Sequence, residues 1–166
     1  MSRGARVVLD NALYHLITRG NQKQRVFIEN IDFEEYLKRL RQYKREFKFR
    51  LYGFCLMPNH VHLIGAIEQK EHLAKFMQSL NSSYSVYFNS KYQKVGHLWQ
   101  ERFTSKVIVK DRYAIDCINY IELNPLRADM IDTPYQYQWS SYKERNLAAD
   151  RDRKMLDELS LSGTPS

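Results

Sequence analysis

The sequence predicts an α+β fold in which helices pack against an antiparallel β-sheet. Short β-prone segments alternate with longer amphipathic segments in the order β-α-β-β-α-β-α. Hydrophobic residues make up 43% of the 166 residues and aromatic residues 13%, which is enough apolar material for one buried core. We expect a single domain over residues 1–145, followed by a polar tail at 146–166.

Four segments have the composition of strands. Residues 12–18 are short, apolar and β-prone, and residues 103–109 have the same character. Residues 51–57 and 60–67 flank a Pro-Asn turn and are expected to pair with each other. Both faces of the second of these strands carry apolar residues, so we expect it inside the sheet with cover on both sides.

Three segments have helical periodicity. Apolar residues recur at helical spacing over 31–47, where Asp32 is the expected N-cap, and again over 71–89. A third helix is expected over 111–124. It should stop at Pro125, whose ring nitrogen cannot donate a backbone hydrogen bond.

The chain is strongly basic, with 26 Lys and Arg against 19 Asp and Glu and a formal net charge of +7. A protein this basic most often binds a polyanion, meaning nucleic acid or, less often, an acidic membrane surface. Seven basic residues and one acid lie over 36–50. This side of the predicted first helix is either a phosphate-binding surface or simply solvated.

Other protein classes are excluded by composition. The two cysteines, Cys55 and Cys117, are far apart and in no paired motif, which excludes a disulfide framework and a cysteine-rich zinc site. No apolar run approaches the roughly 20 residues that span a bilayer. The first residues contain no apolar signal-peptide core. We therefore expect a cytoplasmic protein with no membrane partner.

The first chemical signal is the pair His60 and His62. Alternate residues of a strand point to the same face, so the two imidazoles should lie side by side. Imidazole is a ligand for Mn, Fe, Co, Ni and Zn, and it can serve Mg when water and phosphate oxygens fill the other positions. The alternative is a chance pair whose nitrogens are satisfied by neighbouring groups.

The second signal is Tyr120 followed by Asn124. Residues four apart lie on one side of a helix, and here they border its apolar arc. The Asn side chain could supply an oxygen to a hard cation, with the phenol close to the same ion. The alternative is a core tyrosine and an Asn-Pro helix stop.

Four blocks of sequence, in order, resemble one known family. MPNHVHL at 57–63 is similar to the His-hydrophobic-His (HUH) motif of single-tyrosine transposases, and YIELNPLRA at 120–128 is similar to their nucleophile helix. HLITRGNQKQRVF at 15–27 and GHLWQERF at 96–103 resemble one branch, the REP-associated tyrosine transposases. The resemblance covers residues 14–142, approximately. This branch is part of the insertion-sequence-200-like transposase family.

The resemblance implies a ferredoxin-like sandwich that forms a single HUH-type domain. It implies a transposase that binds single-stranded DNA beside a hairpin, such as a palindromic REP element. Tyr120 would attack the scissile phosphate and form a 5′-phosphotyrosine, and a 3′-OH would later reseal the strand. His60, His62 and Asn124 would hold Mg²⁺ or Mn²⁺, which polarises the phosphate. Relatives include both monomers and homodimers.

We expect basic and amide side chains in several segments to contact the DNA. Asn21 and Gln24 are candidates for reading base edges, because their amides can pair with bases. His15 is expected to support structure rather than bind metal, and the role of His97 is open between substrate contact and loop packing. The full set of expected DNA-binding residues is Arg3, Arg6, Arg19, Asn21, Lys23, Gln24, Arg25, Arg102 and Lys106.

Two other functions compete with this hypothesis. One is a non-catalytic RNA-binding module on a ferredoxin-like sheet, but the strands lack the Lys/Arg-Gly-Phe-x-Phe pattern of such modules. The other is a metal-dependent nuclease that uses water as the nucleophile. A protein–DNA adduct that survives denaturation would separate the tyrosine mechanism from both.

Overall fold

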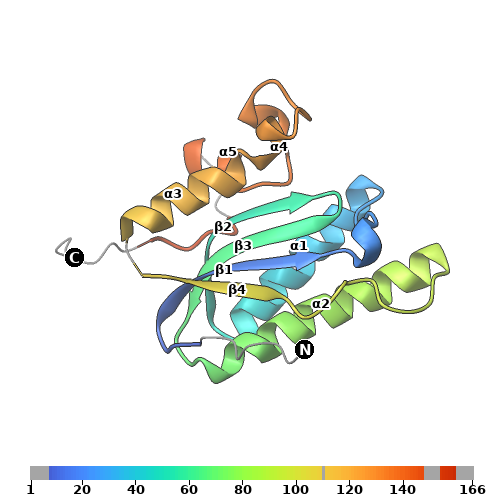
Figure 1. Cartoon of the computed structure of the whole chain (residues 1–166), viewed down its shortest axis with the longest axis horizontal. Coiled ribbons are helices and arrows are strands. Elements are labelled where there is room, and N and C mark those ends of the chain that lie inside the picture. The colour runs from blue at the N-terminus through green and yellow to red at the C-terminus, as the bar shows by residue number, and fades with distance from the viewer. Residues whose placement is uncertain (1–7, 110, 148–153, 160–166) are drawn as a thin grey trace.

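The computed structural model describes residues 8–109, 111–147 and 154–159. Its centre is a four-stranded sheet in the order β2-β3-β1-β4, with every neighbouring pair antiparallel (Figure 1). This order is that of a ferredoxin-like sheet, which confirms the predicted α+β class. The strands are β1 (Ala12–Arg19), β2 (Phe49–Met57), β3 (His60–Ile67) and β4 (Thr104–Ile108).

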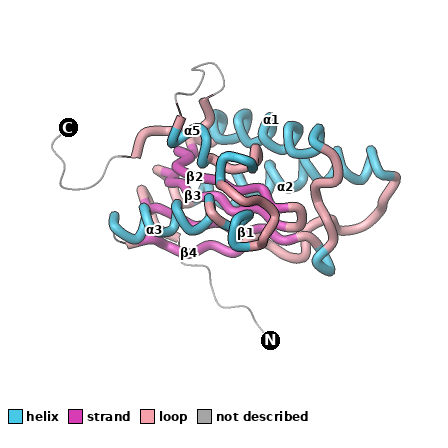
Figure 2. Tube along the Cα trace, turned by 90° about the horizontal axis from the view of Figure 1, so that it is seen from above, coloured by secondary structure: helices cyan, strands magenta, loops and turns pink. Residues whose placement is uncertain are grey.

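Helices cover both faces of the sheet. Two long helices, α1 and α2, lie side by side on one face, and α3 lies across the other (Figures 1 and 2). The helices are α1 (Asn30–Glu46), α2 (Glu71–Tyr92), α3 (Asp111–Glu122), α4 (Asn124–Arg127) and α5 (Tyr142–Asn146), with short 3₁₀ turns at Asn21–Lys23 and Pro134–Gln136. No helix in the described ranges is long and apolar enough to cross a membrane.

Two buried clusters hold these layers together, one on each face of the sheet. The larger lies against α1 and α2 and includes Tyr36, Phe76 and Leu63. The smaller joins the sheet to α3 through residues such as Ile64 and Ile118. Both faces of β3 are buried, as its sequence predicts, because alternate residues enter opposite clusters.

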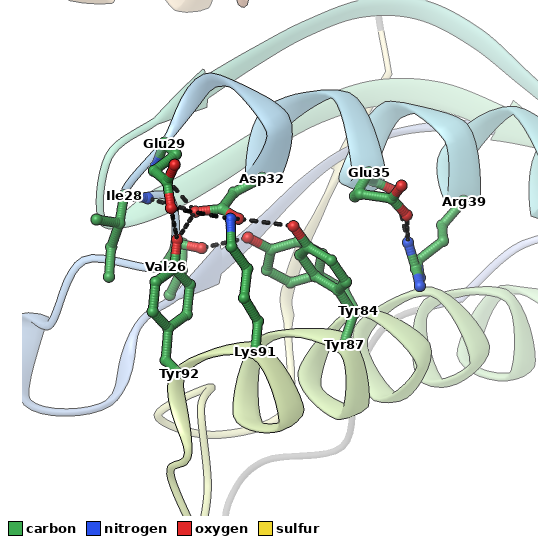
Figure 3. Close-up of polar contacts among 10 residues, drawn as sticks. All are labelled: Val26, Ile28, Glu29, Asp32, Glu35, Arg39, Tyr84, Tyr87, Lys91 and Tyr92. Carbon is green, nitrogen blue, oxygen red and sulfur yellow. Dashed lines mark hydrogen bonds and ion pairs between the residues drawn. The ribbon is translucent and has the colours of Figure 1, made fainter.

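The helix starting near residue 31 begins earlier than expected. Glu29 is its N-cap and Asp32 is its third residue, where the two form a capping box. The carboxylate of Asp32 is fully buried and accepts hydrogen bonds from the backbone of Ile28 and Glu29 (Figure 3). It also accepts from three side chains of α2, namely Tyr87, Lys91 and Tyr92, so one carboxylate joins the start of α1 to the end of α2.

The helix expected over 111–124 is divided into two. Helix α3 ends at Glu122, and α4 starts at Asn124 with Pro125 in its first turn. Pro125 has no N–H to donate to the carbonyl of Ile121, so one hydrogen bond of a continuous helix is missing here, which explains the break. The backbone nevertheless keeps i to i−4 hydrogen bonds at Leu123 and Arg127, so the chain follows one helical path through the break.

Part of the expected polar tail belongs to the core. Met155 and Leu156 are buried in the larger cluster, and their backbone N–H groups donate to the carboxylate of Glu144 at 2.7 and 2.6 Å. Asp157 forms an ion pair with Lys44 of α1 at 2.8 Å. Two apolar residues therefore attach this polar segment to the domain, although the domain was expected to end at residue 145.

Candidate active site

His60 and His62 lie on the face of the sheet that is covered by α3. Their rings are 4.9 Å apart between centroids, in an edge-to-face arrangement. Nδ1 of His60 lies 2.7 Å from Oδ1 of Asn59, and Nδ1 of His62 lies 2.9 Å from Nε2 of His15. Each histidine therefore has its Nδ1 engaged by a neighbouring side chain, and Nε2 is the ring nitrogen that could bind a ligand.

All three imidazoles of this cluster are neutral at pH 7. Burial, followed by the charges of its neighbours, lowers the pKa of His62 to about 3. Burial, with Lys106 and Arg19 adding to it, lowers the pKa of His15 to about 4, and burial together with Arg19 also lowers the pKa of His60. A neutral imidazole has the free lone pair that a metal ion requires.

Asn124 reaches the histidines from the other layer. Its amide nitrogen lies 3.4 Å from Nε2 of His60, and turning the amide over would present Oδ1 to the same position. Two imidazoles and an amide oxygen form a donor set that suits a divalent cation completed by phosphate oxygens. Across the described residues no group of three His, Cys, Asp or Glu side chains could hold a metal ion, and the role of Asn124 as a third donor stays a prediction.

Tyr120 is an exposed residue of α3, with 57% of its surface accessible. The guanidinium of Arg127 lies over its ring, 3.8 Å from the centroid, and Nη2 of Arg127 donates to the backbone oxygen of Tyr120 at 2.5 Å. The sequence reasoning missed Arg127, although a residue seven positions after Tyr120 falls on the same side of a helix. Tyr120, Asn124 and Arg127 share one side of the α3–α4 path.

The surroundings of the site are cationic. Arg19 stands opposite His60 in the β1–β3 register, and Lys106 stands opposite His15 in the β1–β4 register. The charged side chains that shift the histidine pKa values are, among the described residues, Arg19, Lys106 and Arg127. A metal bound here would add further positive charge, and the site would then favour an anionic ligand.

The loop after β1 is fixed between two parts of the site. Gly20 donates to the backbone oxygen of Asn59 at 2.8 Å, and Asn21 donates to that of Leu98 at 2.8 Å. A Cβ atom on Gly20 would lie 2.3 Å from the oxygen of Gln24, so the tight turn of the loop itself requires glycine here. The loop therefore links the histidine turn to the segment around Leu98.

The amides expected to read bases already have partners in the protein. The side chain of Gln24 donates to the backbone oxygen of Leu98 at 3.2 Å, and that of Asn21 donates to the oxygen of His97 at 3.4 Å. Each amide keeps a second N–H and its oxygen for other contacts. Their side chains thus lie along the border between the loop and the 96–102 segment.

The other expected DNA-binding residues lie in several places. Arg19 and Lys106 flank the histidines, whereas Arg102 lies before the start of β4. A groove of about 560 Å³ between α2 and the 96–102 segment includes His97 and Arg102 in its lining. Lys23 and Arg25 are exposed on the loop after β1. Arg3 and Arg6 lie outside the described residues.

The basic side of α1 is far from the histidines. A cavity of about 630 Å³ at the end of this helix is lined by Arg41, Arg45 and Lys48 beside Phe49. Phe49 pairs with the last residue of β3, while His60 is its first, so the cavity lies about 23 Å away along the strand at ~3.3 Å per residue. A phosphate-binding role for this side of α1 stays a prediction.

Comparison with known proteins identifies the family. The sequence profile described as IS200-like transposase matches residues 8–124 of the chain. This chain belongs to the IS200-like transposase family. The matched part of this family member includes both histidines, Tyr120 and Asn124, and ends just before Arg127.

Two similar proteins carry the comparison further. A Haemophilus influenzae protein with the provisional name REP-associated tyrosine transposase is 24% identical over 127 residues, covering 70% of this transposase-family chain and 71% of the relative. A solved structure of a REP-associated tyrosine transposase bound to a REP hairpin matches with a TM-score of 0.73 at 17% identity, covering 96% of this chain and 92% of that one. The family match confirms the resemblance to insertion-sequence-200-like transposases, and the structural match confirms the fold.

Proposed function

We propose that this protein is a metal-dependent single-strand DNA endonuclease and strand transferase that acts next to DNA hairpins through a 5′-phosphotyrosine intermediate. The observation that carries the proposal is one arrangement of side chains. Two neutral imidazoles and an amide converge beside an exposed tyrosine that is covered by a guanidinium, and the nearby charges are positive. Such a site needs an anionic substrate and offers it a nucleophile.

In the proposed cleavage step, Oη of Tyr120 attacks the scissile phosphorus as its proton leaves for solvent. A bond from Oη to phosphorus forms, the bond from phosphorus to O3′ breaks, and O3′ takes up a proton from solvent. The products are a 5′-phosphotyrosine and a free 3′-OH. Because the number of phosphodiester bonds is unchanged, a second 3′-OH can attack the phosphotyrosine and reseal the strand without ATP.

The side chains around Tyr120 would divide the remaining work. Nε2 of His60, Nε2 of His62 and Oδ1 of Asn124 would hold Mg²⁺ or Mn²⁺, which supplies Lewis-acid stabilisation of the charged phosphate when bound. Arg127 packs on the nucleophile ring and has further N–H donors for a phosphate oxygen. Arg19 sits beside His60 and would balance the charge of the incoming DNA backbone.

For the DNA partner we propose a palindromic repeat that forms a hairpin next to a single strand. Support comes from the relative whose structure contains a REP hairpin, and from the cationic loop after β1. In the same loop, the side chains of Asn21 and Gln24 donate to the backbone oxygens of His97 and Leu98, which line the groove that contains Arg102. A monomer suffices for the proposed cleavage site, since one chain carries all the residues named; a homodimer would double the site.

The test is a covalent capture assay on a pool of single strands. Each strand carries a hairpin of random sequence, a random single-stranded flank and a label at the 3′ end, because the 5′-phosphotyrosine retains the 3′ fragment. With Mg²⁺ or Mn²⁺ we expect a labelled protein band on a denaturing gel, and none with EDTA. Cleavage without adduct would indicate a water-dependent nuclease instead, and binding without cleavage would indicate a non-catalytic module.

A further inference from the structure

Each histidine of the pair His60 and His62 has its Nδ1 in contact with a neighbouring side chain. Oδ1 of Asn59 lies 2.7 Å from Nδ1 of His60, and Nε2 of His15 lies 2.9 Å from Nδ1 of His62. A carbonyl oxygen can only accept a hydrogen bond, so Nδ1 of His60 carries the proton. Its Nε2 then has the free lone pair, on the side that faces Asn124.

The contact between His15 and His62 can be made in two ways. If Nδ1–H of His62 donates to His15, Nε2 of His62 keeps its lone pair. If Nε2–H of His15 donates instead, the proton of His62 sits on Nε2 and blocks ligand binding there. Which nitrogen holds the proton therefore decides whether His62 can bind a metal ion at all.

We propose that His15 accepts the Nδ1–H of His62, so that His15 and Asn59 are a matched pair of positioning residues behind the two metal ligands. This inference rests on the proposed function for the identity of the ligands. The geometry suits a directed bond, because the two rings are inclined by only 25° with centroids 5.1 Å apart. Partners of this kind fix the ring orientation and the protonated nitrogen of a ligating histidine.

The fold holds both positioning residues in place. His15 and His62 are 9% and 6% exposed, and the β1–β3 ladder sets them diagonally across neighbouring strands on the same face. Asn59 is tied to the loop after β1, because its backbone oxygen accepts from Gly20 at 2.8 Å. His15, expected from the sequence only to support structure, has its Nε2 turned toward His62 and thus acts through that ligand.

The first test reads the protonated nitrogens directly. Long-range ¹H–¹⁵N correlation spectra of the metal-free wild-type protein distinguish an Nδ1–H from an Nε2–H imidazole. We expect His60 and His62 both to carry the proton on Nδ1. A wild-type His62 with its proton on Nε2 would overturn the proposal.

The second test measures Mn²⁺ affinity by electron paramagnetic resonance. His15→Leu removes the acceptor and should weaken Mn²⁺ binding about 10- to 100-fold, as loss of an outer partner usually does. His15→Gln keeps an acceptor at the same reach and should recover most of the affinity. His72→Leu, at a half-buried histidine at the start of α2, is the matched control and should bind Mn²⁺ as the wild type does. Equal affinity of the His15→Leu variant and the wild type would contradict the proposal.

The two tests separate this inference from the proposed function. If the wild type forms the adduct but its His62 carries the proton on Nε2, only the positioning role of His15 is overturned. If both histidines carry the proton on Nδ1 and the wild type binds Mn²⁺ but forms no adduct, only the proposed reaction is overturned. A wild type that binds no Mn²⁺ would overturn both.

Discussion

The buried carboxylate of Asp32 offers a quantitative test of how α1 and α2 are held together. Burial alone would raise the pKa of this group, but hydrogen bonds from Lys91, Tyr92, the Glu29 backbone and Tyr87 outweigh it and hold the pKa well below its usual value. Replacing Asp32 by Asn removes the charged acceptor that these groups share and leaves Lys91 paired with the more exposed carboxylate of Glu29, 3.1 Å away. A hydrogen bond to a charged group contributes about 1.5–3 kcal/mol, so losing the charge of Asp32 should cost about that much.

That loss should be visible in thermal unfolding. At about 2–4 °C per kcal/mol for a domain of this size, Asp32→Asn should lower the Tm by about 3–12 °C at pH 7. Glu35→Gln is the matched control, since Glu35 is a carboxylate on the same helix in a partly exposed i,i+4 pair with Arg39 (Figure 3). Such pairs are worth about 0.3–0.5 kcal/mol, so the control should melt within about 2 °C of the wild type.

The pH dependence of the same pair of proteins checks the cause. A carboxyl group whose pKa is lowered by folding stabilises the protein above its unfolded pKa of about 3.9. That stabilisation is lost as the pH falls through the lower folded value. The difference in Tm between wild type and Asp32→Asn should therefore be constant from pH 7 to pH 5 and shrink below about pH 4. A difference of under 2 °C at pH 7, or one that grows on acidification, would refute this account.

Three further predictions concern the reaction. His60→Ala and His62→Ala should each abolish cleavage in Mg²⁺ while DNA binding changes little. Asn124→Ala should have a milder effect on cleavage because water can replace an amide oxygen. Cleavage that persists in EDTA would contradict the metal role. Arg127→Met should slow adduct formation about 10- to 150-fold, which corresponds to the loss of a charge-assisted hydrogen bond of about 1.5–3 kcal/mol. Arg127→Lys should recover only part of the rate, because a lysine lacks the planar guanidinium. An unchanged single-turnover rate would exclude the role of this side chain. Arg25→Ala should lower the slope of log K against log salt by about 0.7–0.9, with equal loss on cognate and scrambled hairpins, and an unchanged slope would show that the residue contacts no phosphate.

Local rules predicted much of the fold and of the site. Every expected strand and helix is present, because period-two and helical patterns are set by neighbouring residues. The same rule placed His60 and His62 on one face. The order of the strands came only from the resemblance, since it depends on pairing between distant segments.

The features that sequence reasoning missed depend on contacts between distant residues. His15 and His62 are 47 positions apart and meet only because β1 pairs with β3 in one register. Asp32 looked like an N-cap because its main partners, on α2, are invisible in the local sequence. Met155 is buried because its segment packs against the domain, and the mostly polar sequence of that segment does not predict this packing. Arg127 is the exception, since helical spacing from Tyr120 could have identified it.

The central claim, that Tyr120 is the nucleophile, is tested most directly by mapping the adduct. After digestion of the captured DNA, cleavage at Arg112 and Arg127 releases one peptide, residues 113–127, which contains both Tyr113 and Tyr120. Tyr113 is similarly exposed on the same helix, so fragmentation of this peptide compares two tyrosines under one condition. The account predicts the nucleotide phosphate on Tyr120, with no adduct from Tyr120→Phe and a normal yield from Tyr113→Phe. A phosphate on Tyr113, or a wild-type adduct yield from Tyr120→Phe, would contradict it.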